Sequence, residues 1–283
     1  MIVVENLSFT YPGSSSPVLQ NLNFRIEEGE IFGFLGPSGA GKSTTQKILY
    51  KTLRDYRGEI RIKNESLEKW GKEYFENIGV GFELPNHYLK LTARENLDLF
   101  GSFYSRERLM NINELAEIVG LTDSLDKKVE EYSKGMKMRL NFVRAIMHDP
   151  DILFFDEPTA GLDPMNAHKI KEHIVSLKNQ GKTIFITTHN MTTADEICDR
   201  VSFIVEGKLR VTDKPFALKH KHGQHLVKVE LKNSKTAEFP LENLGGNNEF
   251  LRFINDGEIL RINTQEATLE EVFIQVTGKL LKE

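Results

Sequence analysis

The residues best able to do chemistry lie in the stretch FGFLGPSGAGKSTTQ, residues 32–46. Gly36, four further residues and then Gly41-Lys42-Ser43 fit the P-loop pattern, between an expected strand and an expected helix. Glycines let backbone N–H groups converge on phosphate oxygens, and the helix N-terminus adds its dipole. Lys42 is expected to reach the outer phosphates and Ser43 to offer a Mg²⁺ ligand. The expected nucleotide-binding residues of this loop are Gly36, Pro37, Ser38, Gly39, Ala40, Gly41, Lys42, Ser43 and Thr44.

A pair of carboxylates follows a second apolar run, in ILFFDEP, residues 152–158. A strand buried by helices on both faces is expected there, and α/β sheets bind ligands at the carboxyl ends of such strands. Asp156 is expected to hold Mg²⁺, directly or through water, and Glu157 to act on the water that attacks the γ-phosphate. Paired acids at a strand end also occur in solvated turns, but the P-loop upstream favours the catalytic interpretation.

A second anion site is indicated far from the P-loop, in EEYSKGMKMRLNFVRAIMHDPDILFFDEPTAGLDP, residues 130–164. Ser133 and Gly135 stand at the start of an expected helix, where a hydroxyl and backbone N–H groups can bind a phosphate. One chain would then carry two helix ends that bind phosphate.

The elements that must position these groups alternate between short apolar strands and helices. Such alternation is typical of an α/β layer with a largely parallel sheet. The expected strands are residues 31–35, 152–155, 183–187 and 201–205, and the expected helices begin at 43, span 164–179 and lie near 192.

Residues 85–148 follow a different pattern, with helical spacing and no β-branched runs. Thr92 and Glu95 have the spacing of a capping box at a helix start. Leu97, Phe100 and Tyr104 then share one helical face, which core packing alone explains. A mostly helical insertion between two parts of the α/β layer is therefore expected.

The tail after residue 213 is expected to be a small α+β appendage. DKPFALKHKHGQH is interpreted as a polar linker, and LVKVEL and EILRI as strands. Thr268 and Glu271 are expected to cap a final helix. The linker contains His220, His222 and His225, for which a metal site is one interpretation and a solvated basic hinge the favoured one.

Composition narrows the function classes. The formal net charge of −4 argues against a protein that binds the phosphate backbone of nucleic acid. The single Cys198 has no partner for a disulfide, which suits a reducing compartment. The longest apolar runs are far shorter than the ~20 residues of a transmembrane helix. A cytoplasmic location is therefore expected.

The motifs and their order strongly resemble the nucleotide-binding subunit of ATP-binding cassette (ABC) transporters, over the first 215 residues or so. The signature motif L-S-G-G-Q of that family appears as Tyr132-Ser133-Lys134-Gly135-Met136. The resemblance implies a P-loop NTPase RecA-like α/β core with an N-terminal antiparallel β portion, a helical subdomain at about 85–148 and a small α+β C-terminal appendage. The implied domains are an ABC ATP-binding domain, 1–213, and the appendage, 214–283.

The same resemblance assigns further residues. It implies that two subunits, identical or not, face head to tail, so that Ser133 and Gly135 of one close over the γ-phosphate held by the P-loop of the other. Tyr11 is expected to stack on adenine, although a packing role at a strand end is the alternative. His189, in FITTHN, is expected to contact the γ-phosphate, and Asp163, in AGLDP, to cross the dimer interface.

Two departures from the family pattern stand out. Glu83, in VGFELPNHY, replaces the glutamine that touches Mg²⁺ and the attacking water. A carboxylate can still coordinate Mg²⁺, but it adds negative charge beside the γ-phosphate and cannot donate a hydrogen bond. Altered coupling rather than lost binding is expected, with Ser43, Asp156 and Glu83 as the metal ligands. In the signature, Lys134 either adds a cation near the γ-phosphate or points into solvent.

The function implied is ATP hydrolysis, with Lys42, Glu157 and His189 as catalytic residues, coupled to transport through a separate transmembrane permease. LPNHYLKL, residues 84–91, is the candidate docking segment. Glu83, LTARENL and YSKGM are similar to the bacterial branch that exports antibiotics or gives immunity to antimicrobial peptides, so export is favoured. Two alternatives are a soluble ABC ATPase of translation or DNA repair, and a nucleotide-gated regulatory subunit with little hydrolysis.

Overall fold

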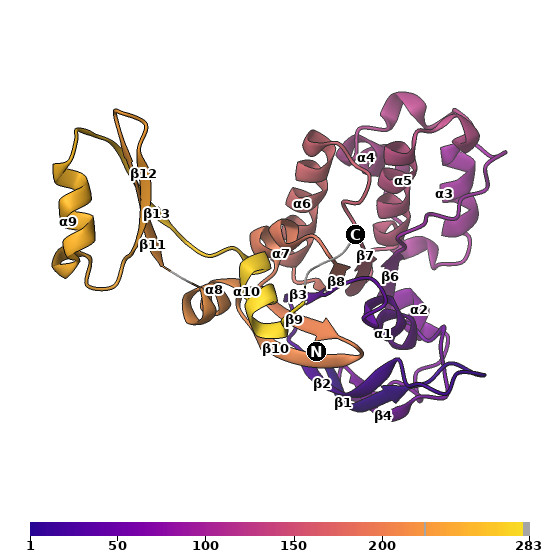
Figure 1. Ribbon diagram of the computed structural model, residues 1–283. Coiled ribbons are helices and arrows are strands. Elements are labelled where there is room, and N and C mark those ends of the chain that lie inside the picture. The colour runs from indigo at the N-terminus through magenta and orange to yellow at the C-terminus, as the bar shows by residue number, and fades with distance from the viewer. Residues whose placement is uncertain (224, 280–283) are drawn as a thin grey trace. The chain divides into compact units, whose positions relative to one another are not determined.

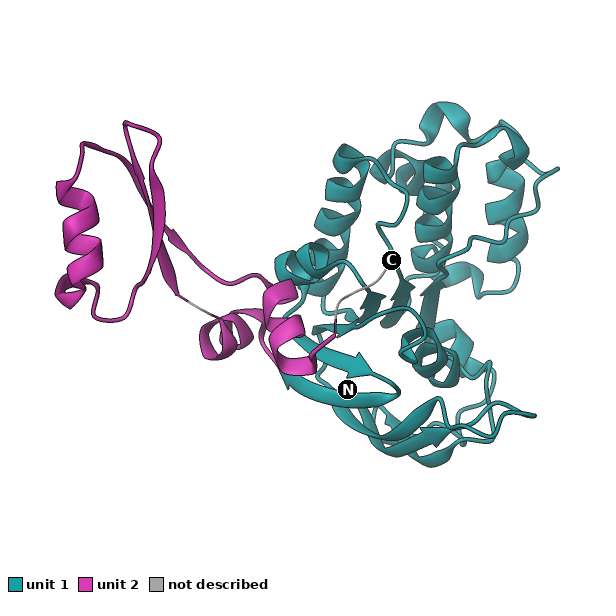
Figure 2. Cartoon of the chain, viewed as in Figure 1, with its two compact units in different colours: residues 1–212, 281–283 teal, residues 213–280 magenta. Residues whose placement is uncertain are grey.

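The computed structural model describes residues 1–223 and 225–279. The chain divides into two compact units, the first ending at Thr212 and the second beginning at Asp213 (Figure 2). This division falls one residue before the domain boundary expected from the sequence.

The first unit contains a six-stranded sheet with the order β10-β9-β3-β8-β7-β6 (Figure 1). Its strands are β3 (Ile31–Leu35), β6 (Ile78–Gly81), β7 (Ile152–Asp156), β8 (Thr183–Thr188), β9 (Arg200–Val205) and β10 (Lys208–Asp213). The pairs β9-β3, β3-β8, β8-β7 and β7-β6 are all parallel. Because parallel strands end at one edge, the loops after β3, β6, β7 and β8 gather there.

Helices cover this sheet, and every residue of β3 and β8 is buried. The helices are α1 (Lys42–Leu49), α5 (Lys134–Ile146), α6 (Pro164–Asn179) and α7 (Met191–Ile197). Contacts join α1 and α6 to β8, α5 to β6, and α7 to β3. Strands buried on both faces explain the continuous apolar runs ILFFD and TIFIT.

An antiparallel sheet with the order β2-β1-β4-β5 lies in the same unit. Its strands are β1 (Ile2–Phe9), β2 (Leu19–Ile26), β4 (Arg57–Ile62) and β5 (Glu65–Ser66). Phe24 of β2 packs 4.9 Å from Phe34 of β3, ring centroid to ring centroid, so the two sheets share one core. The expected N-terminal antiparallel portion is present.

Between β6 and β7 the chain is mainly helical, as expected. The helices there are α3 (Ala93–Gly101), α4 (Ile112–Ile118) and α5, with short 3₁₀ turns η1 (Arg106–Arg108), η2 (Thr122–Ser124) and η3 (Val129–Glu131); α2 (Glu73–Asn77) precedes β6. Thr92 and Glu95 form the complete capping box at the start of α3.

The second unit contains a three-stranded sheet with the order β12-β11-β13. Its elements are α8 (Pro215–His222), β11 (Leu226–Leu231), β12 (Thr236–Pro240), η4 (Leu244–Gly246), α9 (Asn248–Asn255), β13 (Ile259–Gln265) and α10 (Leu269–Thr277). Val227, Val229 and Leu231 form its core with Phe239 and side chains of α9. The capping box of Thr268 and Glu271 is confirmed.

The polar linker expected after residue 213 is wrong, because residues 215–222 form the helix α8. Pro215 occupies the first turn, where its fixed φ suits a helix and its missing N–H costs nothing. Leu218 is buried, and α8 contacts α10. A single buried leucine among many polar residues gives too little apolar periodicity for the sequence to predict this helix.

Candidate active site

The loop between β3 and α1 requires glycine for steric reasons at two positions. A Cβ on Gly36 would lie 2.2 Å from the carbonyl oxygen of Ile204. Gly41 has a φ of 107°, and its Cβ would lie 2.5 Å from Leu19 Cδ2. No side chain caps α1, so the backbone N–H groups of its first turn are available to a ligand. The loop is shaped to bind an anion through its backbone.

Lys42 is the buried cation of this loop. Its Nζ donates to the carbonyl oxygens of Gly36, at 2.7 Å, and of Pro37, at 3.2 Å. Burial lowers the pKa of Lys42, and attraction by Glu157, Asp156 and then Glu83 partly opposes that shift. The three carboxylates that the sequence assigned to hydrolysis and metal binding therefore lie close enough to act on this ammonium group. Ser43, half-buried, follows it in the first turn of α1.

Asp156 and Glu157 stand at the carboxyl end of β7, as expected. Asp156 Oδ1 accepts a hydrogen bond from Thr187 Oγ1. Glu157 is buried and has a φ of 50°, a left-handed conformation that non-glycine residues rarely adopt. The turn directs the Glu157 side chain to the end of the neighbouring strand β8.

Three donors from the end of β8 converge on the Glu157 carboxylate. Thr188 Oγ1 donates to Oε2 at 2.8 Å, and the backbone N–H of His189 donates to Oε1 at 2.8 Å. The Nδ1 atom of His189 also lies 2.6 Å from Oε1. The structure thus brings Glu157 and His189 together, while half of the imidazole side chain stays exposed.

Three residues around the two carboxylates and the P-loop helix were not identified from the sequence. Thr187 and Thr188 fix the two carboxylates, and the only signal for them was their place in FITTHN. Gln46 of α1 is buried and donates to the carbonyl oxygens of Phe155, at 3.0 Å, and Phe185, at 3.4 Å. These hydrogen bonds of Gln46 connect α1 to β7 and β8.

Tyr11 lies beside the P-loop helix. Its hydroxyl is 3.2 Å from Thr44 Oγ1, and its ring meets Phe9 edge to face with centroids 4.9 Å apart. The stacking of Tyr11 on adenine stays a prediction, but its ring is only partly buried next to a residue of the loop.

The signature residues form a separate cluster. Ser133 caps α5, its hydroxyl accepting from the N–H of Met136 at 3.2 Å. The side chain of Lys134 lies along the backbone of Gly161, where a Cβ would be 2.9 Å from Lys134 Cε. Across the described part of the chain, no hydrogen bond or ion pair joins Ser133 or Gly135 to the P-loop. Within these residues the signature cluster and the P-loop are therefore two separate groups.

Asp163 is the N-cap of α6 and borders this cluster. Its carboxylate accepts from the Asn166 backbone N–H at 3.0 Å and from Asn166 Nδ2 at 2.6 Å. Hydrogen bonds from the side chain and then the backbone of Asn166 lower its pKa. The carboxylate therefore stays ionised on an exposed helix start.

Glu83 is exposed, two residues beyond the end of β6. Two side chains of α5 hold the segment that carries it. Asn141 Nδ2 donates to the carbonyl oxygen of Phe82 at 2.7 Å, and Arg144 donates to that of Asn86 at 2.8 Å. The helix that begins at the signature motif thus also anchors the loop of Glu83.

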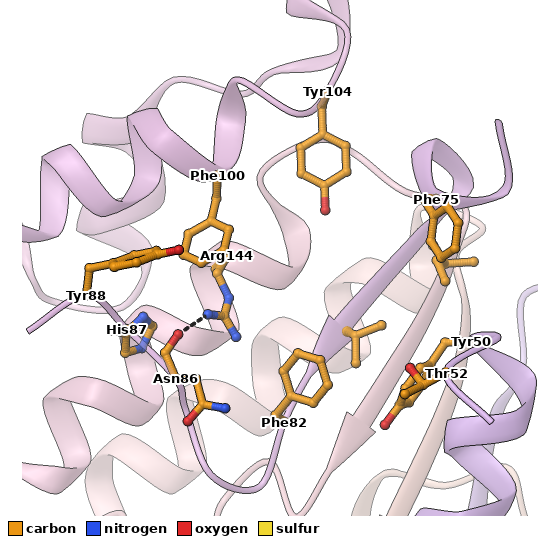
Figure 3. A pocket seen from close by; sticks show the side chains of 12 residues that line it. Tyr50, Thr52, Phe75, Phe82, Asn86, His87, Tyr88, Phe100, Tyr104 and Arg144 are labelled. Carbon is orange, nitrogen blue, oxygen red and sulfur yellow. Dashed lines mark hydrogen bonds between the residues drawn. The ribbon is translucent and has the colours of Figure 1, made fainter. Parts of the chain in front are cut away.

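A groove of about 620 Å³ lies beside this segment (Figure 3). Asn86, His87 and Tyr88 belong both to the expected docking segment and to the wall of the groove. Figure 3 shows Tyr50 and Phe75 across the groove from them. The lining residues are Tyr50, Thr52, Phe75, Ile78, Val80, Phe82, Asn86, His87, Tyr88, Phe100, Tyr104 and Arg144.

Residues 1–223 and 225–279 lack two features. No group of three or more His, Cys, Asp or Glu side chains there could hold a metal ion on its own. No helix of that part of the chain is long and apolar enough to cross a membrane.

Comparisons with known proteins agree on one family. Residues 19–160 match the ABC transporter family. The chain is 47% identical to a fluoroquinolones export ATP-binding protein of Mycobacterium tuberculosis, over 99% of this chain and 94% of that protein. It is 32% identical to the bacitracin transport ATP-binding protein BcrA of Bacillus licheniformis, over 98% and 97% respectively.

Solved structures agree with this and confirm the expected fold class. The ATP-binding subunit of an ABC transporter matches with a TM-score of 0.71 at 29% identity, covering 79% of this chain and 93% of that one. A dimeric post-hydrolysis state of an ATP-binding cassette, bound to ADP and Pi, matches with a TM-score of 0.69 at 28% identity, covering 76% and 98%.

Proposed function

Since the chain belongs to the ABC transporter family, we propose that it is the ATP-hydrolysing subunit that powers export through a separate membrane permease. The observation that carries the proposal is the position of Glu157. Its carboxylate is held by Thr188 and His189 at the end of β7 and attracts the buried Lys42 of the P-loop. This arrangement supports Glu157 as the base for the attacking water and Lys42 as the cation for the phosphates.

In this mechanism the chain's own groups bind, orient and accept a proton. Backbone N–H groups of residues 36–44 and the Lys42 ammonium hold the phosphates of ATP. Glu157 accepts the proton of the water that attacks the γ-phosphate, and His189 holds the Glu157 carboxylate in place. Tyr11 stacks on adenine beside Thr44.

The residues present fit a Mg²⁺ ion. The charges of Asp156 and Glu83 act on the buried Lys42, and Ser43 follows Lys42 in the chain. Carboxylate and hydroxyl oxygens are the hard donors that Mg²⁺ prefers. When bound, the ion neutralises charge on the outer phosphates. Thr187 orients the Asp156 carboxylate for that role.

The full site requires two copies. Ser133 and Gly135, which form no hydrogen bond with the P-loop in the described part of their own chain, stand at a helix start that suits a phosphate. In a head-to-tail dimer these residues close over the γ-phosphate bound by the partner, and the exposed Asp163 lies at the interface. Loss of the phosphate removes the ligand that joins the halves and releases the dimer.

The permease docks at the groove beside residues 84–91, on the cytoplasmic face of the membrane. Relatives are named for fluoroquinolones, bacitracin and Nod factor, so similar ATP-binding subunits serve different cargoes. We therefore place the choice of cargo in the permease. Export is favoured over import because these relatives are named for export or transport of such compounds.

ATP turnover by purified variants tests the site. We expect Glu157→Gln and Lys42→Ala to lose nearly all hydrolysis, because the first removes the base and the second the phosphate-binding cation. Lys47→Ala is the matched control, since Lys47 is an exposed lysine of the same helix. Near-normal turnover in Glu157→Gln or Lys42→Ala would remove that residue from the catalytic step.

A further inference from the structure

The groove beside residues 82–86 contains a buried cation whose partners are all neutral. Arg144 is 8% exposed, and its guanidinium donates to the Asn86 carbonyl oxygen and to Asn141 Oδ1. Its Cζ lies 4.7 Å from the centroid of the Phe100 ring and 5.6 Å from that of Phe82. Within the described residues, no ion pair involves Arg144. Burial lowers its pKa, as expected for a charge that is poorly compensated.

The rest of the groove adds aromatic surface and no negative charge. None of its lining residues is acidic. Apolar side chains of α2 and of the loop after β6 are left open to solvent, with exposed fractions of 47% for Phe75, 72% for Leu84 and 56% for Tyr88. An apolar surface of this kind, with one cation inside it, favours a peptide segment over a small anion.

His87 lines the same wall and is neutral. Its Nε2 lies 3.0 Å from the Lys137 carbonyl oxygen, so Nε2 carries the proton and Nδ1 has the lone pair. Burial lowers the pKa of His87 to about 4, so the ring is neutral at physiological pH. Nδ1 is buried and has no partner in the described chain. Because Nδ1 is enclosed by the protein, His87 gives the groove neutral surface and no further charge.

We propose that the permease segment that docks in this groove carries an Asp or Glu that pairs with Arg144, among aromatic or aliphatic side chains that cover Phe75, Phe82 and Tyr88. This inference rests on the proposed function and names the chemistry of its partner. The aromatic walls exclude water, so a carboxylate brought to the planar guanidinium forms a strong, directional ion pair. Removing either member leaves the other charge buried and alone.

Crosslinking from the groove tests what occupies it. The photoreactive amino acid benzoylphenylalanine replaces Tyr88, and the variant is expressed in cells. Intact cells are irradiated, and the crosslinked protein is then digested and analysed by mass spectrometry. We expect a crosslinked peptide from a cytoplasmic loop of a multi-spanning membrane protein, with an Asp or Glu within about four residues of the crosslink. A peptide from a membrane protein that has no Asp or Glu near the crosslink overturns the ion pair with Arg144 and leaves the proposed function standing. Crosslinks only to a second copy of this chain, or no crosslinks at all, overturn both the ion pair with Arg144 and the proposed docking of a permease.

A double-mutant cycle then tests the pair itself. Affinity between this chain and the purified permease is measured for Arg144→Gln, for the permease acid changed to its amide, and for both together. We expect each single change to weaken binding by about tenfold or more, and the double variant to bind no more weakly than either single variant. Additive losses overturn the pair, because Arg144 would then act only by holding Asn86.

Arg139→Gln is the matched control for the loss of an arginine from α5. Arg139 donates to the Val119 and Gly120 carbonyl oxygens, outside the groove, and we expect it to leave the affinity for the permease unchanged. If Arg144→Gln misfolds, charge reversal replaces it: Arg144→Glu combined with an arginine at the permease acid should restore binding. Failure of that restoration in a folded Arg144→Glu protein also overturns the pair.

Discussion

The imidazole of His189 and the carboxylate of Glu157 lie together, with Nδ1 2.6 Å from Oε1. A carboxylate can only accept hydrogen bonds, so Nδ1 must carry the proton and the other ring nitrogen remains for a ligand. The same oxygen also accepts from the His189 backbone N–H. The base proposed for hydrolysis is therefore positioned by the residue proposed to contact the γ-phosphate.

The first prediction concerns these donors. His189→Ala removes the Nδ1 donor but keeps the backbone one, and Thr188→Val removes the donor to the other carboxylate oxygen. We expect His189→Ala to slow hydrolysis by about a hundredfold and Thr188→Val by about tenfold, because a misdirected base accepts the proton less well. Single-turnover hydrolysis with saturating ATP measures both. Equal, small effects would show that His189 does not position the base.

The second prediction compares two glycines of the P-loop. A Cβ on Gly36 meets the Ile204 carbonyl oxygen, whereas one on Gly39 has nothing within 4 Å despite a φ of 76°. We expect Gly36→Ala to cost about 3 kcal/mol of unfolding free energy, from overpacking against backbone, and Gly39→Ala about 1 kcal/mol, from the left-handed conformation alone. Urea unfolding without nucleotide measures both. Equal losses would contradict the close packing of the loop on β9.

The third prediction concerns Glu83. Its negative charge attracts Lys42 and so opposes the approach of ATP, but its carboxylate is also proposed as a metal ligand. We expect Glu83→Gln to bind ATP severalfold more tightly in EDTA and to need severalfold more Mg²⁺ for half-maximal turnover. Nucleotide titrations with and without Mg²⁺ separate the two effects. An unchanged Mg²⁺ requirement would exclude Glu83 from the metal site.

The fourth prediction concerns pH. Burial lowers the pKa of His87 to about 4 from its ordinary value of 6.5. Between these values the unfolded chain binds a proton that the folded chain does not, so stability rises with pH by at most about 1.4 kcal/mol per unit. This stability is fully present above pH 6.5 and is lost as the pH falls towards 4. Urea midpoints of His87→Gln should depend less on pH in this range, whereas those of exposed His168→Gln should match the parent.

Local sequence signals predicted the parts of the fold that depend on neighbours in the chain. The capping boxes at Thr92 and Thr268 and the strands around the P-loop were predicted because each is set by spacing within a few residues. The helix at Pro215 was missed because its stability depends on one buried leucine and on α10. Tertiary packing outweighed a polar composition there.

The same distinction applies to the site. The P-loop and the acids at the end of β7 are each contiguous in the chain, so the sequence predicted them. The groove around Arg144 combines Tyr50, Phe75 and Phe100 from separate elements, and no spacing rule connects such distant residues. Thr188 was missed because a threonine at a strand end has many possible roles until its hydroxyl is seen to donate to Glu157.

The last prediction tests whether one site uses two chains. Lys42→Ala damages the P-loop half and Ser133→Ala the signature half, so each variant alone has two defective sites per head-to-tail dimer. In a mixed dimer, the intact P-loop of the Ser133→Ala copy faces the intact signature of the Lys42→Ala copy. Random mixing should therefore restore about a quarter of the parent turnover, since half of the dimers are mixed and each has one intact site of two. If the mixture hydrolyses ATP no faster than either variant alone, the complete site lies within a single chain.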